Sequence, residues 1–211
     1  MGARPDRRIA HSTQERILDA AESLFIENGF AATSLRAIAS AAAVNLAATH
    51  YHFGSKQGLL AAVFHRRIQP IDRARIAALD ELEAADTPLT ARAIVGAFLS
   101  PLRSPPEEAI FERLPNLIGR IMGEPESLVT PLLKNEFAEA AQRYQLALSR
   151  ALPHLSSEDI QWRFHFMIGA MIQLLRFPAP LMQASGAEHF KTGTDHLIDF
   201  VVAGLTQEST S

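Results

Sequence analysis

The chain has 211 residues and no cysteine, which excludes a disulfide-stapled fold and any thiolate metal site. Long hydrophobic runs are missing as well, because the longest strongly apolar stretch, residues 166–172, is far shorter than the ~20 residues that cross a bilayer. The first twelve residues are basic and polar, unlike a secretory signal. No GxSxG elbow, phosphate-binding glycine loop, dinucleotide fingerprint or HExxH motif occurs, so nothing indicates an enzyme. We therefore expect a soluble cytoplasmic protein without cofactor, metal or membrane partner.

A clear excess of either charge is also lacking, since 20 Lys and Arg face 23 Asp and Glu for a net charge of −3. The two parts of the chain nevertheless differ. Residues 1–76 hold ten Lys and Arg and six Asp and Glu, a net of +4, whereas the remainder holds ten and seventeen, a net of −7. Because binding to a polyanion depends on the charge at the contact surface, the basic part is the one expected to meet an anionic partner.

Short helices are predicted for the basic part. Ser12 and Glu15 form a capping box for a helix over about 13–28, which Gly29 ends as a left-handed cap. A second helix begins at Thr33 or Ser34, and a third spans about 46–52 after Asn45. A fourth begins at Ser55 and runs toward Pro70. Two short helices joined by a tight turn are typical of a helix-turn-helix, although spacing alone also fits any small helical subdomain.

The residue identities narrow this choice. Six segments of the basic part have informative residue identities: Thr13–Ala21, Leu24–Phe25, Gly29–Phe30, Ala32–Arg36, Ile38–Ala39 and Tyr51–Lys56. Together they resemble the N-terminal domain of the TetR family of transcriptional repressors, over roughly residues 10–68. One departure is Ala43, where a glycine is common, at a cost of up to about 1 kcal/mol if the turn needs positive φ. A weaker resemblance, carried by residues 45–48, 51–56, 70 and 79–83, points to the fatty-acid-responsive subgroup.

The resemblance implies a set of DNA-contacting residues around the third helix, which would lie in the major groove. They are Thr33, Ser34, Arg36, Asn45, Leu46, Ala47, His50, Tyr51, His52 and Lys56. Leu46 and Ala47 can touch a thymine methyl, Arg36 can pair with guanine, and Lys56 can meet a phosphate at a helix start. The basic arm with Arg4, Arg7 and Arg8 fits a minor groove or a solvated tail equally. His50 and His52 do not suit a metal, because residues two apart on a helix diverge by about 200°.

The acidic part reads as further helices, over roughly 89–103, 107–122, 126–151, 157–177 and 187–206, with Ser156 and Asp159 forming a second capping box. The predicted fold is all-α: an N-terminal helix-turn-helix three-helix DNA-binding domain followed by a helical ligand-binding and dimerisation domain. The predicted parts are a flexible arm at 1–11, the DNA-binding domain at 12–56, a connecting helix at 57–86 and the effector-binding and dimerisation domain at 87–211.

In the acidic part we expect one set of residues that forms a dimer interface and another that lines an effector site. In proteins of the TetR family the last two helices pair across a two-fold axis, which implies dimerisation through Phe164, Ile168, Ile172, Leu175, Leu197, Ile198, Val201, Val202 and Leu205. The remaining helices would enclose an effector. Candidate lining residues are Phe98, Leu102, Phe111, Leu114, Ile118, Arg120, Met122, Phe137, Tyr144, Phe166 and Met167, each of which also suits ordinary core packing.

The sequence thus predicts a homodimeric repressor that binds a palindromic double-stranded operator and is released by a small apolar or amphipathic effector, such as a fatty acyl compound. An activator, or a repressor without an effector, fits the same residues. From another class, a helical enzyme or lipid-binding protein with a protein-interaction head stays open.

Overall fold

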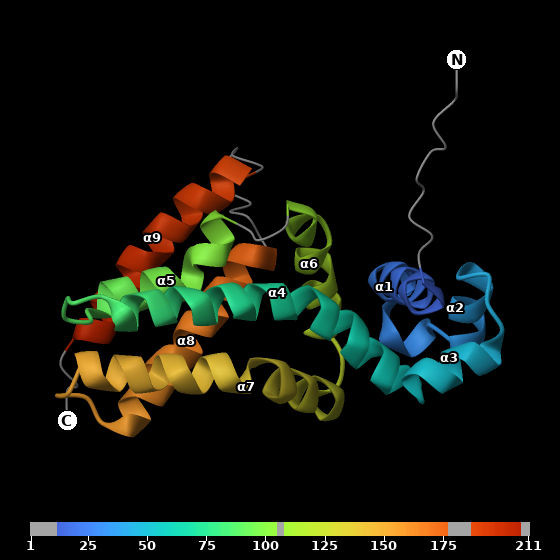
Figure 1. Cartoon of the computed structure of the whole chain (residues 1–211), viewed down its shortest axis with the longest axis horizontal. Coiled ribbons are helices and arrows are strands. Elements are labelled where there is room, and N and C mark those ends of the chain that lie inside the picture. The colour runs from blue at the N-terminus through green and yellow to red at the C-terminus, as the bar shows by residue number, and fades with distance from the viewer. Residues whose placement is uncertain (1–11, 105–107, 177–186, 208–211) are drawn as a thin grey trace, which may run out of the picture. The chain divides into compact units, whose positions relative to one another are not determined.

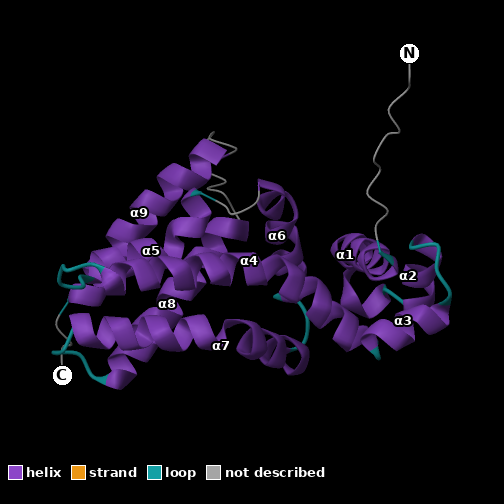
Figure 2. Ribbon diagram, viewed as in Figure 1, coloured by secondary structure: helices purple, strands orange, loops and turns teal. Residues whose placement is uncertain are grey.

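The structure is a computed structural model of the chain and describes residues 12–104, 108–176 and 187–207. Within these ranges the regular elements are α-helices and no strand occurs (Figures 1 and 2), which confirms the all-α prediction. The chain divides into two compact units, Met1–His65 and Arg66–Ser211, which we call the head and the body. The predicted basic arm, residues 1–11, lies outside the described residues.

The head contains three helices and the start of a fourth. They are α1 (Thr13–Ala32), α2 (Leu35–Ala41), α3 (Leu46–Phe53) and α4 (Lys56–Ala84), which continues into the body. The core of the head is built from fully buried residues at helical spacing on α1, α2 and α4, among them Ile17, Phe25, Ile38 and Leu59. Since α2 and α3 are each too short to be stable alone, this shared core is what holds them in place.

The start of α1 follows the predicted capping box. The amide of Glu15 donates to the Ser12 hydroxyl at 3.1 Å, and the Ser12 amide donates to the Glu15 carboxylate at 2.8 Å. Gly29 has φ 80° and ψ 168°, so the predicted positive φ is present. Its ψ departs from a left-handed helical cap, and a single turn resumes up to Ala32 because this glycine-only conformation kinks the helix without ending it.

The body is a helical bundle. Its elements are α5 (Ala91–Arg103), α6 (Glu108–Ile121), α7 (Glu126–Ala151), α8 (Ser157–Arg176) and α9 (Ala187–Thr206), in addition to most of α4. In Figure 1, α5 packs along α9, α9 lies against α8, and α8 contacts α6 and α7. None of the helices in the described ranges combines the length and apolarity that a membrane span requires.

An aromatic cluster forms part of the core of the body. The ring of Phe98 on α5 makes edge contacts with Tyr144 on α7 at 5.0 Å and with Phe164 on α8 at 5.3 Å between centroids. All three side chains are buried. Aromatic pairs in this edge-to-face geometry fix the relative positions of the helices that carry them. The cluster therefore ties α5, α7 and α8 together around one point of the body.

Candidate nucleic-acid interface and effector site

The turn between α2 and α3 is tight and locally bonded. The amide of Ala43 donates to the Ser40 carbonyl at 3.1 Å, and that of Val44 donates to the Ala39 carbonyl at 3.0 Å. Ala43 has φ 52°, the left-handed conformation that the sequence analysis associated with a glycine at this place. Asn45 then caps α3, because its side chain accepts from the Ala47 amide at 2.9 Å. The head therefore contains the predicted helix-turn-helix.

One side of α3 is turned to solvent and bears the side chains predicted to read DNA. Tyr51 is 87% exposed, and Ala47, His50 and His52 are exposed as well, whereas Thr49 is buried against the rest of the head. A phenol this exposed contributes nothing to the core. The surface of α3 thus offers a methyl group, two imidazoles and a phenol, which can contact bases and phosphates.

His50 has a defined hydrogen-bond partner. Its Nδ1 lies 3.1 Å from the carbonyl oxygen of Gly54, which can only accept, so Nδ1 carries the hydrogen. In the neutral ring this leaves Nε2 as an acceptor. Such an atom pairs with the exocyclic amino group of adenine or cytosine rather than with the acceptors of guanine.

Two of the residues predicted to contact DNA are engaged inside the head. The side chain of Thr33 is buried; its hydroxyl donates to the Gly29 carbonyl at 2.7 Å and lies 3.1 Å from the carbonyl oxygen of Leu24. The ammonium of Lys56 donates to the carbonyls of Phe30 at 2.8 Å and Thr33 at 2.9 Å, and lies 4.3 Å from the centroid of the Phe30 ring. Both side chains thus satisfy carbonyls at the end of α1, where a cation also complements the helix dipole.

The start of α2 remains accessible. Ser34 caps this helix by accepting from the Ala37 amide at 3.1 Å, and both Ser34 and Arg36 are exposed. Leu46 at the start of α3 is half-buried. The predicted guanine contact by Arg36 therefore meets no steric obstacle in the head.

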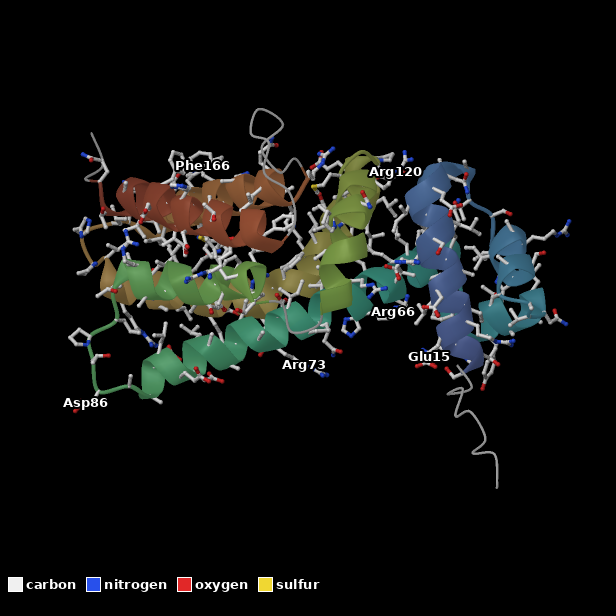
Figure 3. All side chains as sticks on the ribbon, turned by 90° about the horizontal axis from the view of Figure 1, so that it is seen from above. Glu15, Arg66, Arg73, Asp86, Arg120 and Phe166 are labelled. Carbon is white, nitrogen blue, oxygen red and sulfur yellow. The ribbon has the colours of Figure 1, made fainter. Side chains whose placement is uncertain are left out.

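The residues predicted to line the effector site occupy different environments in the body. Phe98, Leu102, Leu114, Ile118, Tyr144 and Met167 are buried, while Met122 and Phe137 are half-buried. Phe166 is 63% exposed on α8, and Arg120 is exposed on α6 (Figure 3). The side chain of Phe111 lies outside the described residues. The structure therefore buries six of these residues, joins Phe98 to Tyr144 by a ring contact, and leaves Phe166 and Arg120 on the surface.

A buried ion pair, which the sequence did not predict, lies beside Phe98 and Tyr144. Arg75 on α4 is 2% exposed, and its Nη1 lies 3.0 Å from a carboxylate oxygen of Asp72. Burial lowers the pKa of the Arg75 guanidinium and raises that of the Asp72 carboxyl, whereas their mutual attraction opposes both shifts. The hydroxyl of Tyr144 donates to the backbone carbonyl of Arg75 at 2.7 Å, and burial of that hydroxyl raises the pKa of Tyr144.

A signal for Arg75 does exist in the sequence. Ile68, Ile71 and Leu79 are buried at helical spacing along α4, and Arg75 occupies the place where this stripe requires another apolar residue. A charged residue on the apolar face of a helix is costly to bury unless it is paired or functional.

Most of the predicted dimer residues are used within the protomer. Phe164, Leu175, Leu197, Ile198, Val201 and Leu205 are buried in the body, and Ile168, Ile172 and Val202 are half-buried. Exposed aromatic side chains stand elsewhere on the same two helices, namely Trp162 at 55%, Phe166 at 63% and Phe200 at 73% exposure. The rings of Trp162 and Phe166 stack at 5.8 Å between centroids.

Comparison with known proteins identifies the family. Residues 17–63 match the family of bacterial regulatory proteins called tetR, and residues 92–204 match the "Tetracyclin repressor-like, C-terminal domain". The second match alone covers more than half of the chain. The chain belongs to the TetR family of transcriptional regulators.

Individual relatives share the head most clearly. The HTH-type transcriptional regulator UidR of Escherichia coli (strain K12) is 41% identical over 54 residues, which is 26% of this chain and 28% of that protein. The HTH-type transcriptional regulator SrpR of Pseudomonas putida is 29% identical over 152 residues, 72% of this chain and 65% of that protein. The match thus spans little more than a quarter of UidR and just under two thirds of SrpR.

Solved structures share the fold. That of AmtR from Mycobacterium smegmatis has a TM-score of 0.60 at 19% identity, covering 96% of this chain and 90% of that one. The TetR family regulator PfmR from Thermus thermophilus has a TM-score of 0.57 at 19% identity, covering 87% of this chain and 97% of that one. At this identity the likeness concerns architecture alone.

Proposed function

We propose that the protein is a homodimeric repressor whose head reads a palindromic operator and whose body binds a small apolar or amphipathic effector that releases it. The observation that carries the first part is the α2–α3 turn followed by an exposed, capped α3 with Tyr51, His50 and His52 on its surface. A basic balance over residues 1–76 supports contact with a polyanion. The proposed domain bounds are a DNA-binding domain at 12–56, a connecting helix at 57–86 and an effector-binding and dimerisation domain at 87–211.

Among the predicted DNA contacts, the exposed ones carry the proposal: Ser34, Arg36, Asn45, Ala47, His50, Tyr51 and His52. Arg36 projects from the exposed first turn of α2 and would form a bidentate pair with guanine. Each such pair contributes about 1–3 kcal/mol of discrimination against the wrong base. His50 would contact a base or a phosphate through Nε2, because its Nδ1 is held by the Gly54 carbonyl.

The test uses fluorescence anisotropy with DNA fragments from upstream of the protein's own coding sequence, at two stated salt concentrations. We expect binding that prefers one sequence and weakens as salt rises. Arg36→Ala should lower the preference at one base pair about tenfold or more, whereas Arg73→Ala, an exposed arginine of the body, should leave affinity and preference unchanged. Absence of any sequence preference in the unmodified protein would refute the proposal.

The second copy of the dimer is proposed to cover the exposed aromatic side chains of α8 and α9. These two helices pack against each other, and they carry Trp162, Phe166 and Phe200 in solvent. Each aromatic ring removes about 150–250 Å² from water when buried, so a soluble protomer gains most by pairing this surface. A dimer also presents two copies of α3, as recognition of two half-sites requires.

Sedimentation velocity tests the dimer. Phe166→Glu places a charge within the proposed interface and should yield monomers at concentrations where the unmodified chain is dimeric. Leu146→Glu is the matched control, because Leu146 is an apolar side chain 53% exposed on α7, outside α8 and α9. If both variants remain dimeric, or if the unmodified chain is monomeric, the interface is elsewhere or absent.

A further inference from the structure

Arg75 is the feature of the body that core packing does not explain. Among the described residues of the body it is the only charged side chain that is buried. It stands on the apolar stripe of α4, where a leucine or methionine would fill the same space without desolvating a charge. Replacing a buried ion pair with apolar residues is often neutral or stabilising. A guanidinium here therefore desolvates a charge that an apolar side chain would not, and this points to a role beyond packing.

The surroundings of the guanidinium coincide with the residues predicted to form the effector site. Its central carbon lies 4.0 Å from the centroid of the Phe98 ring and 6.0 Å from that of Phe137. Tyr144 bonds to the backbone of the same residue, and Phe98 contacts Tyr144 and Phe164 edge-on. A single cation therefore stands inside an aromatic wall, which suits a ligand with an apolar body and one anionic group.

The hydrogen bonds of Arg75 leave capacity for such a group. Nε donates to the Phe98 carbonyl at 3.0 Å, Nη1 to Asp72 at 3.0 Å, and Nη2 to the Met171 sulfur at 3.2 Å. These bonds use three of the five N–H donors of a guanidinium, and a thioether is a weak acceptor. The methionine side chain is flexible and adapts to new neighbours. A carboxylate oxygen in place of the sulfur would convert a weak contact into a charge-assisted hydrogen bond.

We propose that Arg75 is the anchor for the effector, and that the effector is therefore an organic acid with an apolar body, whose carboxylate takes the place of the Met171 thioether at Nη2. This inference rests on the proposed function, in which the body binds an effector. It assigns the anionic group to Arg75 and not to Arg120, which is exposed on α6. A single carboxylate fits better than a phosphate, because the carboxylate of Asp72 already offsets part of the charge of this one buried cation.

The position of Arg75 on α4 supplies a route from ligand to DNA. The helix runs from Lys56 to Ala84, so it crosses from the head into the body. A ligand that forms a stronger bond to Arg75 in one position of α4 than in another shifts the protein toward that position. The difference in affinity between the two positions is what sets the extent of release.

The first test needs no mutation. Isothermal titration calorimetry compares acids with the alcohols of the same skeleton: benzoate with benzyl alcohol, octanoate with octanol, and decanoate with decanol. We expect at least one acid to bind about tenfold or more tightly than its alcohol. The inference is refuted if the alcohols bind as tightly as the acids, or if no acid binds at concentrations up to about 1 mM, the weak limit of specific binding.

Variants then assign the preference to a residue. Arg75→Met should abolish the preference for the acid, whereas Arg73→Met, an exposed arginine on the same helix (Figure 3), should retain it. Because Arg75→Met leaves the Asp72 carboxylate without its partner, Asp72→Asn combined with Arg75→Met serves as the second variant if the first does not fold. A preserved preference in a folded variant that lacks Arg75 refutes the assignment.

Asp72→Asn alone separates a binding role from a structural one. It removes the anion that competes for the guanidinium, so the acid should bind more tightly although the protein loses its ion pair. A residue that served packing alone would give no such gain, and unchanged or weaker binding of the acid counts against the proposal.

DNA binding is measured on the same proteins. Ligand-free Arg75→Met should still bind the operator but resist release by the acid. Release of the unmodified protein by alcohols but not by acids would refute this inference and leave the proposed function intact. Failure of the unmodified protein to bind DNA would refute the proposed function, while the preference for acids over alcohols would still be measurable.

Discussion

Ala43 provides the sharpest test of how the helix-turn-helix is stabilised. It holds φ 52° in the turn before α3, and its methyl group is exposed. The left-handed conformation costs a non-glycine residue roughly 1–2 kcal/mol. Glycine relieves this strain but gives up about 0.4–1 kcal/mol through the greater freedom of the unfolded chain. Ala43→Gly should therefore stabilise the head by about 1 kcal/mol, net of both effects.

The matched control is Ala41→Gly, two residues earlier at the end of α2. Ala41 is also exposed, and as the last residue of α2 it has a helical backbone conformation, which favours alanine over glycine. The same loss of one methyl group should destabilise the protein here by about 1 kcal/mol. The two substitutions are thus chemically identical but should change the stability in opposite directions.

Urea denaturation followed by circular dichroism at 222 nm measures both variants, with thermal melts as a second readout. A change of 1 kcal/mol corresponds to about 2–4 °C in a chain of this length. The denaturation midpoint should rise for Ala43→Gly and fall for Ala41→Gly. If the Ala43 variant is no more stable than the unmodified protein, the turn is not strained and the reasoning fails.

Three further substitutions test local geometry by the same denaturation assay. Gly58→Ala should destabilise by about 1–3 kcal/mol, because a methyl group would overlap the backbone carbonyl of Phe53; an unchanged midpoint would show that the approach of the two segments is looser. Tyr144→Phe should lower the free energy of unfolding by about 1 kcal/mol through the lost hydrogen bond to the Arg75 carbonyl. Unchanged stability would show that this bond does not stabilise the fold. Ser12→Ala should cost about 1 kcal/mol by uncapping α1, a prediction contradicted by equal stability.

Local signals account for what could be read from the chain alone. The helix starts at Thr13 and Leu46 follow from capping residues that bond to amides two or three positions ahead, so their chemistry lies within one turn. The resemblance places a glycine at the position of Ala43 but left open whether the turn needs a positive φ there, and the structure has φ 52°. The family assignment is local in the same sense, since it depends on the order and spacing of residues in the head.

Side-chain roles that depend on partners far along the chain could not be predicted from such local signals. Lys56 is predicted to contact a phosphate because it opens a helix, but no local pattern indicates that its ammonium also bonds to carbonyls 23 and 26 residues earlier. Phe98 and Phe166 are both aromatic residues within apolar helical segments. Only the packing of neighbouring helices leaves Phe166 63% exposed and Phe98 2% exposed. Periodicity identifies apolar faces but not which of two faces meets the protomer's own core.

The sequence by itself determined the all-α class, the helix-turn-helix and membership of the TetR family, because caps, turns and motif order are encoded over a few residues. The tertiary structure decided where the charge of Arg75 lies. The guanidinium bonds to Asp72, three residues away, and also to the Phe98 carbonyl and the Met171 sulfur, which are 23 and 96 residues away. Burial of a charge depends on every helix around it. The spacing of Ile68, Ile71 and Leu79 places Arg75 on the apolar face of α4, but no local pattern specifies the aromatic rings of other helices that surround this cation.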